Sequence, residues 1–151
     1  MSKVDSDMEI LEFAISKEVE AHHFYLALSR RVDNESIRNV LEDLAGEELE
    51  HKERLELEMM KSGRTVTTEY QPPRSDGDYI LTDSPSLLDM DYKDVLLLAM
   101  EKEEAAFRTY VNLVANVHGQ ESQELLLALA EEEVKHKLRF ETEYNELFKK
   151  T

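Results

Sequence analysis

The sequence predicts an all-α fold, an antiparallel four-helix bundle made of two helical hairpins joined by a long crossover. Charged residues make up 34% of the chain, whereas only four glycines and three prolines occur, which is typical of long helices with one face in solvent. Apolar residues recur at helical spacing in four segments. The two halves of the chain also resemble each other, which indicates that one hairpin is repeated.

Four segments have the apolar spacing of amphipathic helices, with approximate limits of 8–31, 34–61, 91–117 and 120–149. The first helix is expected to follow an N-cap at Ser6 or Asp5, because Glu9 can complete a capping box with Ser6. Asn34 is expected to open the second helix. The connections within the first pair and within the second pair are short, so each pair should form an antiparallel hairpin.

The segment between the two hairpins, residues 64–90, has a different composition. It contains four residues that interrupt a helix, namely Pro72, Pro73, Gly77 and Pro85. An extended chain covers about 3.3 Å per residue, so a segment of this length can cross a whole bundle. We therefore expect a crossover within one domain, residues 1–151, and a disordered loop is the alternative.

The internal repeat becomes visible when the sequence is shifted by 85 residues without gaps. Residues 11–60 and 96–145 are then identical at 18 of 50 positions, more than shared helical composition would produce. The repeat pairs the following ionisable residues: Glu18 with Glu103, Glu48 with Glu133, and His51 with His136. A repeat of this kind predicts a bundle with pseudo-twofold symmetry.

Each helix places ionisable residues in the middle of an otherwise apolar seam. Glu18 is the single charged member of the first seam and Glu103 of the third, whereas the second and fourth seams carry Glu-x-x-His. A lone carboxylate in a core costs several kcal/mol, and four that converge repel one another, so cations would be needed to balance them. Because residues i and i+3 share a helix face, Glu-x-x-His can offer an oxygen and a nitrogen to one ion.

These residues predict a site for two metal ions with six ligands, Glu18, Glu48, His51, Glu103, Glu133 and His136. One Glu from each of two helices and Glu-x-x-His from the other two is the ligand set of di-iron carboxylate bundles. A single Glu-x-x-His in a glutamate-rich helix usually belongs to a solvated face, but two at the repeat offset favour a metal centre. The ligand types favour iron or manganese, and zinc is the alternative.

Composition narrows the remaining classes of function. The formal net charge of -16 disfavours a nucleic-acid partner, since so acidic a surface repels phosphate. The absence of cysteine excludes disulfides, iron–sulfur ligation and thiol catalysis. We see neither a signal peptide at the start nor an apolar run long enough for a membrane span, so a cytoplasmic protein is expected.

The motifs resemble the rubrerythrin branch of the ferritin-like diiron-carboxylate superfamily. The resemblance rests on four motifs, Glu18-x-x-Ala21-x-x-x-Tyr25, Glu48-x-x-His51, Glu103-x-x-Ala106-x-x-x-Tyr110 and Glu133-x-x-His136. It implies that Glu48 and Glu133 bridge two iron ions. It further implies that Glu18 and His51 complete one ion, and that Glu103 and His136 complete the other.

The same resemblance suggests roles for three residues around the ligands. Tyr25 and Tyr110 look like the tyrosines that hydrogen-bond ligand carboxylates in this family, and an ordinary place in the core is the alternative. His22 could contact a ligand, although a partly exposed helix histidine is the commoner case.

Two departures from rubrerythrin bear on function. The chain has no cysteine-rich rubredoxin module, so electrons would come from an external donor such as a rubredoxin. Typical rubrerythrins carry an extra glutamate where this chain has Ala106, which makes the ligand set more like that of bacterioferritin. We expect an oxidoreductase that reduces hydrogen peroxide or dioxygen, in a homo-oligomer with a dimer favoured. The alternatives are a ferroxidase that handles iron and a structural bundle with a vestigial site.

Overall fold

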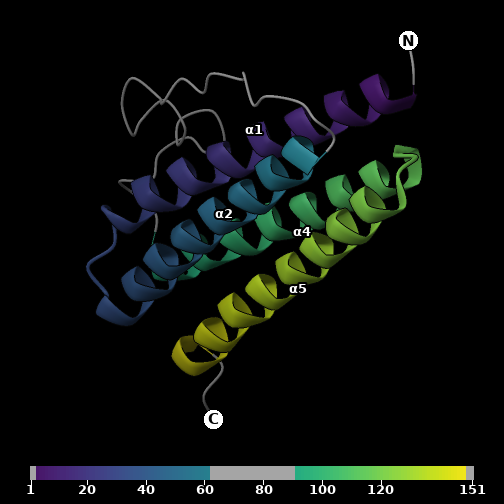
Figure 1. Ribbon diagram of the computed structural model, residues 1–151. Coiled ribbons are helices and arrows are strands. Elements are labelled where there is room, and N and C mark those ends of the chain that lie inside the picture. Colours follow the sequence, from purple (N-terminus) through teal and green to yellow (C-terminus); the bar gives the residue numbers. More distant parts are fainter. Residues whose placement is uncertain (1–2, 62–90, 149–151) are drawn as a thin grey trace.

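The computed structural model describes residues 3–61 and 91–148, which form four helices (Figure 1). Their bounds are Lys3–Ser29 for α1, Glu35–Lys61 for α2, Tyr92–Asn116 for α4 and Gln120–Phe148 for α5. The predicted all-α four-helix bundle is confirmed. The predicted crossover, residues 64–90, lies outside the described residues. None of the four helices has the length and apolar character that crossing a membrane requires.

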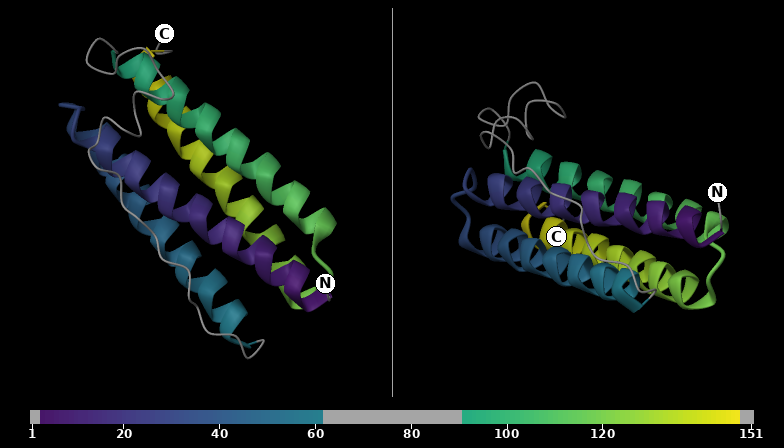
Figure 2. Two further views of the ribbon diagram at one scale, coloured as in Figure 1. Left: turned by 90° about the horizontal axis from the view of Figure 1, so that it is seen from above. Right: turned by 45° about the horizontal axis from the view of Figure 1, so that its top comes forward.

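The helices pack as two antiparallel hairpins laid side by side. α1 packs on α2 and α4 packs on α5, while α1 also contacts α4 and α2 contacts α5, as Figure 2 shows. Helices α2 and α5 are antiparallel to each other. Glu58 near the end of α2 lies beside Ser122 at the start of α5. Ser36 at the start of α2 donates a hydrogen bond to Glu143 near the end of α5. The end of α2 and the start of α4 therefore lie at opposite ends of the bundle, as a crossover requires.

The apolar core consists of two clusters with a charged layer between them. One cluster includes Leu28, Leu41 and Leu96, and the other includes Leu11 and Leu126, all fully buried. The sequence repeat exchanges the two clusters, since it pairs Leu11 with Leu96 and Leu41 with Leu126. The layer between them holds the buried glutamates and histidines, and apolar packing on both sides fixes its height in the bundle.

The helix starts agree with the expected caps except in α1. Asn34 Oδ1 accepts a hydrogen bond of 3.0 Å from the backbone N–H of Ile37 at the start of α2. The prediction that Ser6 or Asp5 caps α1 is wrong, because α1 begins at Lys3 and both residues lie inside it. The capping signal is local, whereas the next residue of α1 is Asp7, whose contacts are made with the distant α4–α5 connection.

Asp7 joins the N-terminal part of α1 to the turn between α4 and α5. Its Oδ1 accepts the backbone N–H of His118 and its Oδ2 accepts that of Gly119, both at 2.8 Å. A Cβ at Gly119 would stand 3.3 Å from Oδ2, so the glycine allows the close approach. Burial acts to raise the pKa of Asp7, but the hydrogen bonds from His118 and Gly119 outweigh it and lower the pKa.

Asp7→Asn is expected to destabilise the protein by about 1.5–3 kcal/mol at neutral pH, the usual range for hydrogen bonds to a charged group. Because the pKa of Asp7 is lowered on folding, its contribution is present at neutral pH and is lost as pH falls through the folded pKa. Urea unfolding at several pH values measures the difference between variant and wild type. Glu9→Gln, at an exposed position two residues further along α1, is the control, and an equal effect of both changes would contradict the prediction.

Candidate metal centre

Six ionisable side chains from all four helices meet in the charged layer between the two apolar clusters. They are the six predicted ligands, Glu18, Glu48, His51, Glu103, Glu133 and His136, and none is more than 3% exposed. They lie at the centres of their helices because the apolar seam continues on either side of each one. The structure thus brings the predicted set together in a single buried layer.

The six residues form two groups that share two members. Glu18 and His51 belong to the first group, Glu103 and His136 belong to the second, and the shared members are Glu48 and Glu133. Within each group, one ligand atom from every residue lies within 4.8 Å of the others. Each group could therefore hold one metal ion, with Glu48 and Glu133 placed between the two.

The two imidazoles present the same nitrogen to the carboxylates. Nδ1 of His51 lies 3.3 Å from Glu18 Oε2 and 3.4 Å from Glu133 Oε1. Nδ1 of His136 lies 3.3 Å from Glu48 Oε1 and 3.5 Å from Glu103 Oε1. The rings are parallel, with an interplanar angle of 4° and centroids 5.7 Å apart. The pseudo-twofold symmetry expected from the sequence repeat thus extends to the imidazoles, each of which has its Nδ1 beside two carboxylates.

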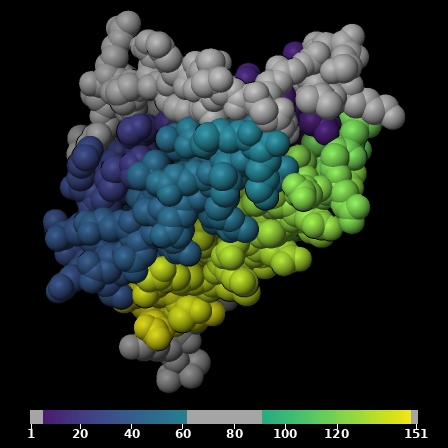
Figure 3. Space-filling model, viewed as in Figure 1, coloured from purple at the N-terminus to yellow at the C-terminus, as the bar shows by residue number. Residues whose placement is uncertain are grey.

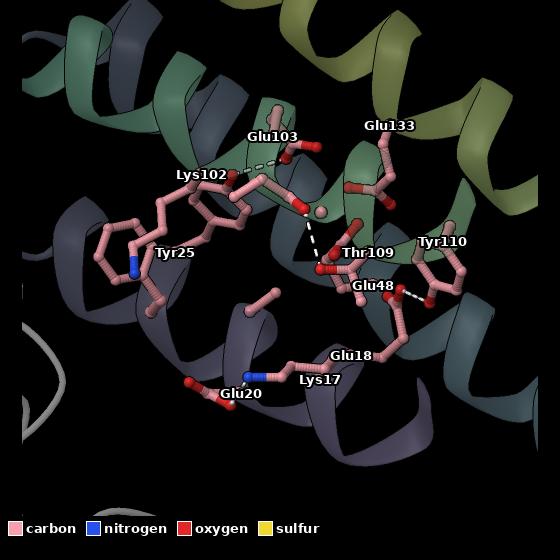
Figure 4. Close-up of a pocket in the computed structure, with 14 residues that line it drawn as sticks. Lys17, Glu18, Glu20, Tyr25, Glu48, Lys102, Glu103, Thr109, Tyr110 and Glu133 are labelled. Atoms are coloured by element: carbon pink, nitrogen blue, oxygen red, sulfur yellow. Dashed lines mark hydrogen bonds and ion pairs between the residues drawn. The ribbon is translucent and has the colours of Figure 1, made fainter. Parts of the chain in front are cut away.

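The two tyrosines make crossed hydrogen bonds between the hairpins (Figure 4). Tyr25 Oη of α1 donates to Glu103 Oε1 of α4 at 2.6 Å, and Tyr110 Oη of α4 donates to Glu18 Oε1 of α1. Burial, together with these carboxylates, raises the pKa of both tyrosines well above the usual range. Both hydroxyls therefore stay protonated and serve as donors.

His22 contacts the backbone of α2. Its Nδ1 is 2.7 Å from the carbonyl oxygen of Ala45 on α2, and the residue is half-buried. This contact joins α1 to α2 within the first hairpin, so the structure gives His22 a bond to the backbone.

Several buried polar atoms of the layer lack hydrogen-bond partners, which favours the binding of cations there. Among residues 3–61 and 91–148, eight buried side-chain atoms have no hydrogen-bond partner, and all eight belong to the six predicted ligands. They are Glu18 Oε2, Glu48 Oε1, His51 Nδ1, Glu103 Oε2, both Glu133 oxygens and both His136 nitrogens. Buried polar groups are rarely left unpaired, because each costs about 1–3 kcal/mol. Two metal ions would satisfy seven of these atoms, all except His136 Nε2, so the residues fit such ions.

The crowding of four buried carboxylates also raises the pKa values of several groups in the layer. Burial and repulsion from Glu18 raise the pKa of Glu48 well above its usual range, and burial and repulsion from Glu48 do the same for Glu133. Burial acts to lower the pKa of His136, but Glu103 and Glu48 outweigh it and raise the pKa to about 10. Protons therefore balance part of the charge when no cation does, and metal ions would displace them.

A cavity of about 210 Å³ lies between α1 and α4 and reaches the carboxylate side of the layer. The carboxylates of Glu18, Glu48, Glu103 and Glu133 line it from within (Figure 4). Ala21, Ala106, Lys17 and Lys102 are among the other residues that line it. His51 and His136 do not line this cavity, so the layer has a carboxylate side towards α1 and α4 and a histidine side towards α2 and α5.

Sequence reasoning missed Glu47, which directly precedes Glu48. Its Oε1 lies 3.6 Å from Nε2 of His136, on the histidine side. The repeat pairs Glu47 with Glu132, and this identity was the signal that could have drawn attention to it.

Comparison with solved structures identifies the class of fold. A hypothetical protein from Pyrococcus furiosus is 26% identical with a TM-score of 0.68, covering 92% of this chain and 88% of that chain. A Thermotoga maritima protein described as ferritin-like and diiron-carboxylate is 23% identical with a TM-score of 0.68, covering 93% and 95%. The bacterioferritin of Desulfovibrio desulfuricans is 14% identical with a TM-score of 0.66, covering 96% and 83%. The fold is therefore that of the ferritin-like four-helix bundles.

The family follows from the sequence match. The family model described as Rubrerythrin matches residues 9–144, and no curated protein matches the sequence. The chain belongs to the rubrerythrin family, as its four motifs predicted.

Proposed function

We propose that this chain is a non-haem diiron oxidoreductase that reduces hydrogen peroxide or dioxygen with electrons from an external donor such as a rubredoxin. The observation that carries the proposal is the pair of four-residue groups that share Glu48 and Glu133. The chain's membership of the rubrerythrin family and its ferritin-like fold also support a diiron centre.

The proposed ligands follow the two groups. Glu18 and His51 would hold one iron ion, Glu103 and His136 would hold the other, and Glu48 and Glu133 would bridge them. Four carboxylates balance the four positive charges of two Fe(II) ions, and hard oxygen donors with imidazole suit iron. Bound there, the iron pair would supply the electrons for reducing peroxide or dioxygen.

The surroundings of the six proposed ligands also suit this chemistry. Tyr25 and Tyr110 hold one oxygen of Glu103 and of Glu18, which fixes the orientation of these carboxylates. The cavity between α1 and α4 offers a small oxidant a path to the carboxylate side. The two apolar clusters keep water away from the layer above and below.

Anaerobic loading with Fe(II), followed by rapid mixing with peroxide or with dioxygen, tests the proposal. We expect two iron ions per chain and a fast change of the iron absorption spectrum without mineral build-up. Progressive mineral formation would instead support ferritin-type iron handling. A chain that takes up no iron, or a loaded chain that peroxide and dioxygen leave unchanged, would contradict the proposed activity.

Ala106→Leu is expected to slow the oxidation of the loaded centre several-fold without changing its iron content. Ala106 lines the cavity but is none of the six proposed ligands, so a larger side chain there narrows the path of the oxidant. Stopped-flow absorption after mixing with peroxide measures the rate, and metal analysis measures the iron content. Ala115→Leu, at an exposed position of the same helix, is the control. Equal oxidation rates in both variants would show that the oxidant uses another path.

A further inference from the structure

We propose that Glu47, Glu132 and Nε2 of His136 form an additional divalent-cation site on the face where α2 meets α5. It would capture a cation from solvent and deliver it to the inner centre, so this inference rests on the dinuclear centre of the proposed function. The three residues form a group whose ligand atoms lie within 4.8 Å of one another.

The geometry of His136 distinguishes this group from an ordinary acidic cluster. The residue is only 3% exposed, yet its Nε2 has no hydrogen-bond partner and lies 3.6 Å from Glu47 Oε1. Side chains of Glu47 and Glu132 are 39% and 31% exposed, so they reach solvent. A buried, unsatisfied nitrogen thus points at two carboxylates that a cation from solvent can reach first.

The position of this outer site follows from the pseudo-twofold symmetry. The repeat pairs Glu47 with Glu132, one on α2 and one on α5, and these helices contact each other. Figure 3 shows this face of the molecule, where α2 in blue and teal meets α5 in lime and yellow. The cavity of the oxidant lies between α1 and α4 instead. Cations and oxidant would therefore reach the inner centre from opposite sides.

Two basic side chains compete for the outer carboxylates. Arg139 Nη1 lies 3.8 Å from Glu47 Oε2, and Lys135 Nζ lies 3.8 Å from Glu132 Oε1. Both basic residues are well exposed, and ion pairs at the surface contribute only about 0–1 kcal/mol. A divalent cation that gains two carboxylates and an imidazole can displace them.

The chemistry of imidazole makes the outer site transient. A cation that binds His136 displaces one of its protons, which leaves one nitrogen as a ligand and a proton on the other. His136 can therefore bind a cation through Nε2 at the outer site or through Nδ1 at the inner centre, but not through both. Once Nδ1 holds a metal ion, Nε2 carries the proton and donates towards Glu47, and the outer site loses its nitrogen ligand. The described outer group includes His136 and not His51, so delivery would reach the half with Glu103.

The rate of Co²⁺ uptake by the metal-free full-length chain tests the proposal. Stopped-flow absorption follows the Co²⁺ bands in wild type, in Glu47→Gln/Glu132→Gln and in the control Glu42→Gln/Glu131→Gln. The control removes the same charge from exposed positions on the same two helices. We expect uptake by the first variant to be slower by about tenfold, the low end of electrostatic effects on association rates. The final content should stay at two Co²⁺ per chain.

The outcomes separate the two proposals. If wild type takes up two Co²⁺ and the two double variants are equally fast, the outer site is overturned while the dinuclear centre stands. If wild type does not take up two Co²⁺, the dinuclear centre fails and delivery to it fails with it.

Binding of Mn²⁺ to a chain with a disabled inner centre gives a second measurement. In Glu48→Gln/Glu133→Gln, electron paramagnetic resonance should detect one weakly bound Mn²⁺ per chain. The signal of bound Mn²⁺ should disappear when Glu47→Gln and Glu132→Gln are added. No bound Mn²⁺ before the addition, or unchanged binding after it, would overturn the outer site.

Discussion

Glu48→Gln is expected to remove both metal ions rather than one, because Glu48 belongs to both groups of ligands. Glutamine has nearly the same shape but is neutral and offers a single oxygen, so both ions would lose one of their two charged bridges and only Glu133 would remain. The affinity should fall by more than about 100-fold, since changing outer hydrogen-bond partners of metal ligands already costs about 10–100-fold. Glu133→Gln should lower the affinity for both ions in the same way, because Glu133 also belongs to both groups.

Metal analysis and calorimetric titration with Fe(II) or Co²⁺ measure this loss. Glu18→Gln provides an informative comparison, because Glu18 belongs to one group only and its loss should weaken one ion. Glu50→Gln, at an exposed position of α2, is the neutral control. If Glu48→Gln retained two tightly bound ions per chain, Glu48 would not be a bridge.

Glu48→Gln should make the protein less stable than wild type when metal is present and more stable than wild type when metal is absent. For wild type, metal at 100 times its dissociation constant should add about 2.7 kcal/mol per site to the free energy of unfolding. For a chain of this size, that raises Tm by about 2–4 °C per kcal/mol. Glu48→Gln should abolish this gain. The metal-free variant should nevertheless be more stable than the metal-free wild type, because one of four buried, mutually repelling carboxylates is gone.

The contribution of Glu48, Glu133 and His136 to the pH dependence of the metal-free protein has a definite sign, opposite to that of Asp7. The pKa values of Glu48 and Glu133 are raised on folding, so their contribution to stability is present at low pH and is lost as pH rises through the folded values. His136, raised to about 10, acts in the same direction. Each pKa unit corresponds to about 1.4 kcal/mol.

Thermal unfolding in the presence of a chelator at several pH values measures this effect. The advantage of metal-free Glu48→Gln over metal-free wild type should grow with pH from acid to neutral. A metal-free variant that unfolds below wild type at all pH values would contradict this account.

Much of the fold and of the candidate site follows from patterns that extend along a helix. The limits of α2, α4 and α5 agree with the apolar spacing to within about a residue. The six residues of the charged layer are recognisable because each interrupts an apolar seam and each recurs after 85 residues. Both signals arise because a helix must present one face to the core, so the sequence itself records which residues face inward.

Contacts between distant residues were harder to anticipate. The contact of Gly119 with Asp7 joins residues 112 positions apart, so no local pattern announces it, and the predicted cap of α1 failed there. His22 has the spacing of a residue near the ligands, but its ring lies against the carbonyl oxygen of Ala45. Which hairpin supplies the tyrosine for each glutamate depends on how the hairpins pack, and the seam alone does not reveal it.

The crossed tyrosine hydrogen bonds affect how Glu18 and Glu103 would bind a metal ion. Tyr25 occupies Oε1 of Glu103 and Tyr110 occupies Oε1 of Glu18, while Oε2 of each glutamate remains unpartnered. Each of these carboxylates would therefore offer a metal ion its free Oε2 first. With one oxygen from this glutamate, an imidazole and two shared glutamates, each proposed ion would receive four protein donors, fewer than the six of an octahedral shell. An exogenous molecule could complete that shell, and chelation through both oxygens of Glu18 or Glu103 would compete with the hydrogen bond from its tyrosine.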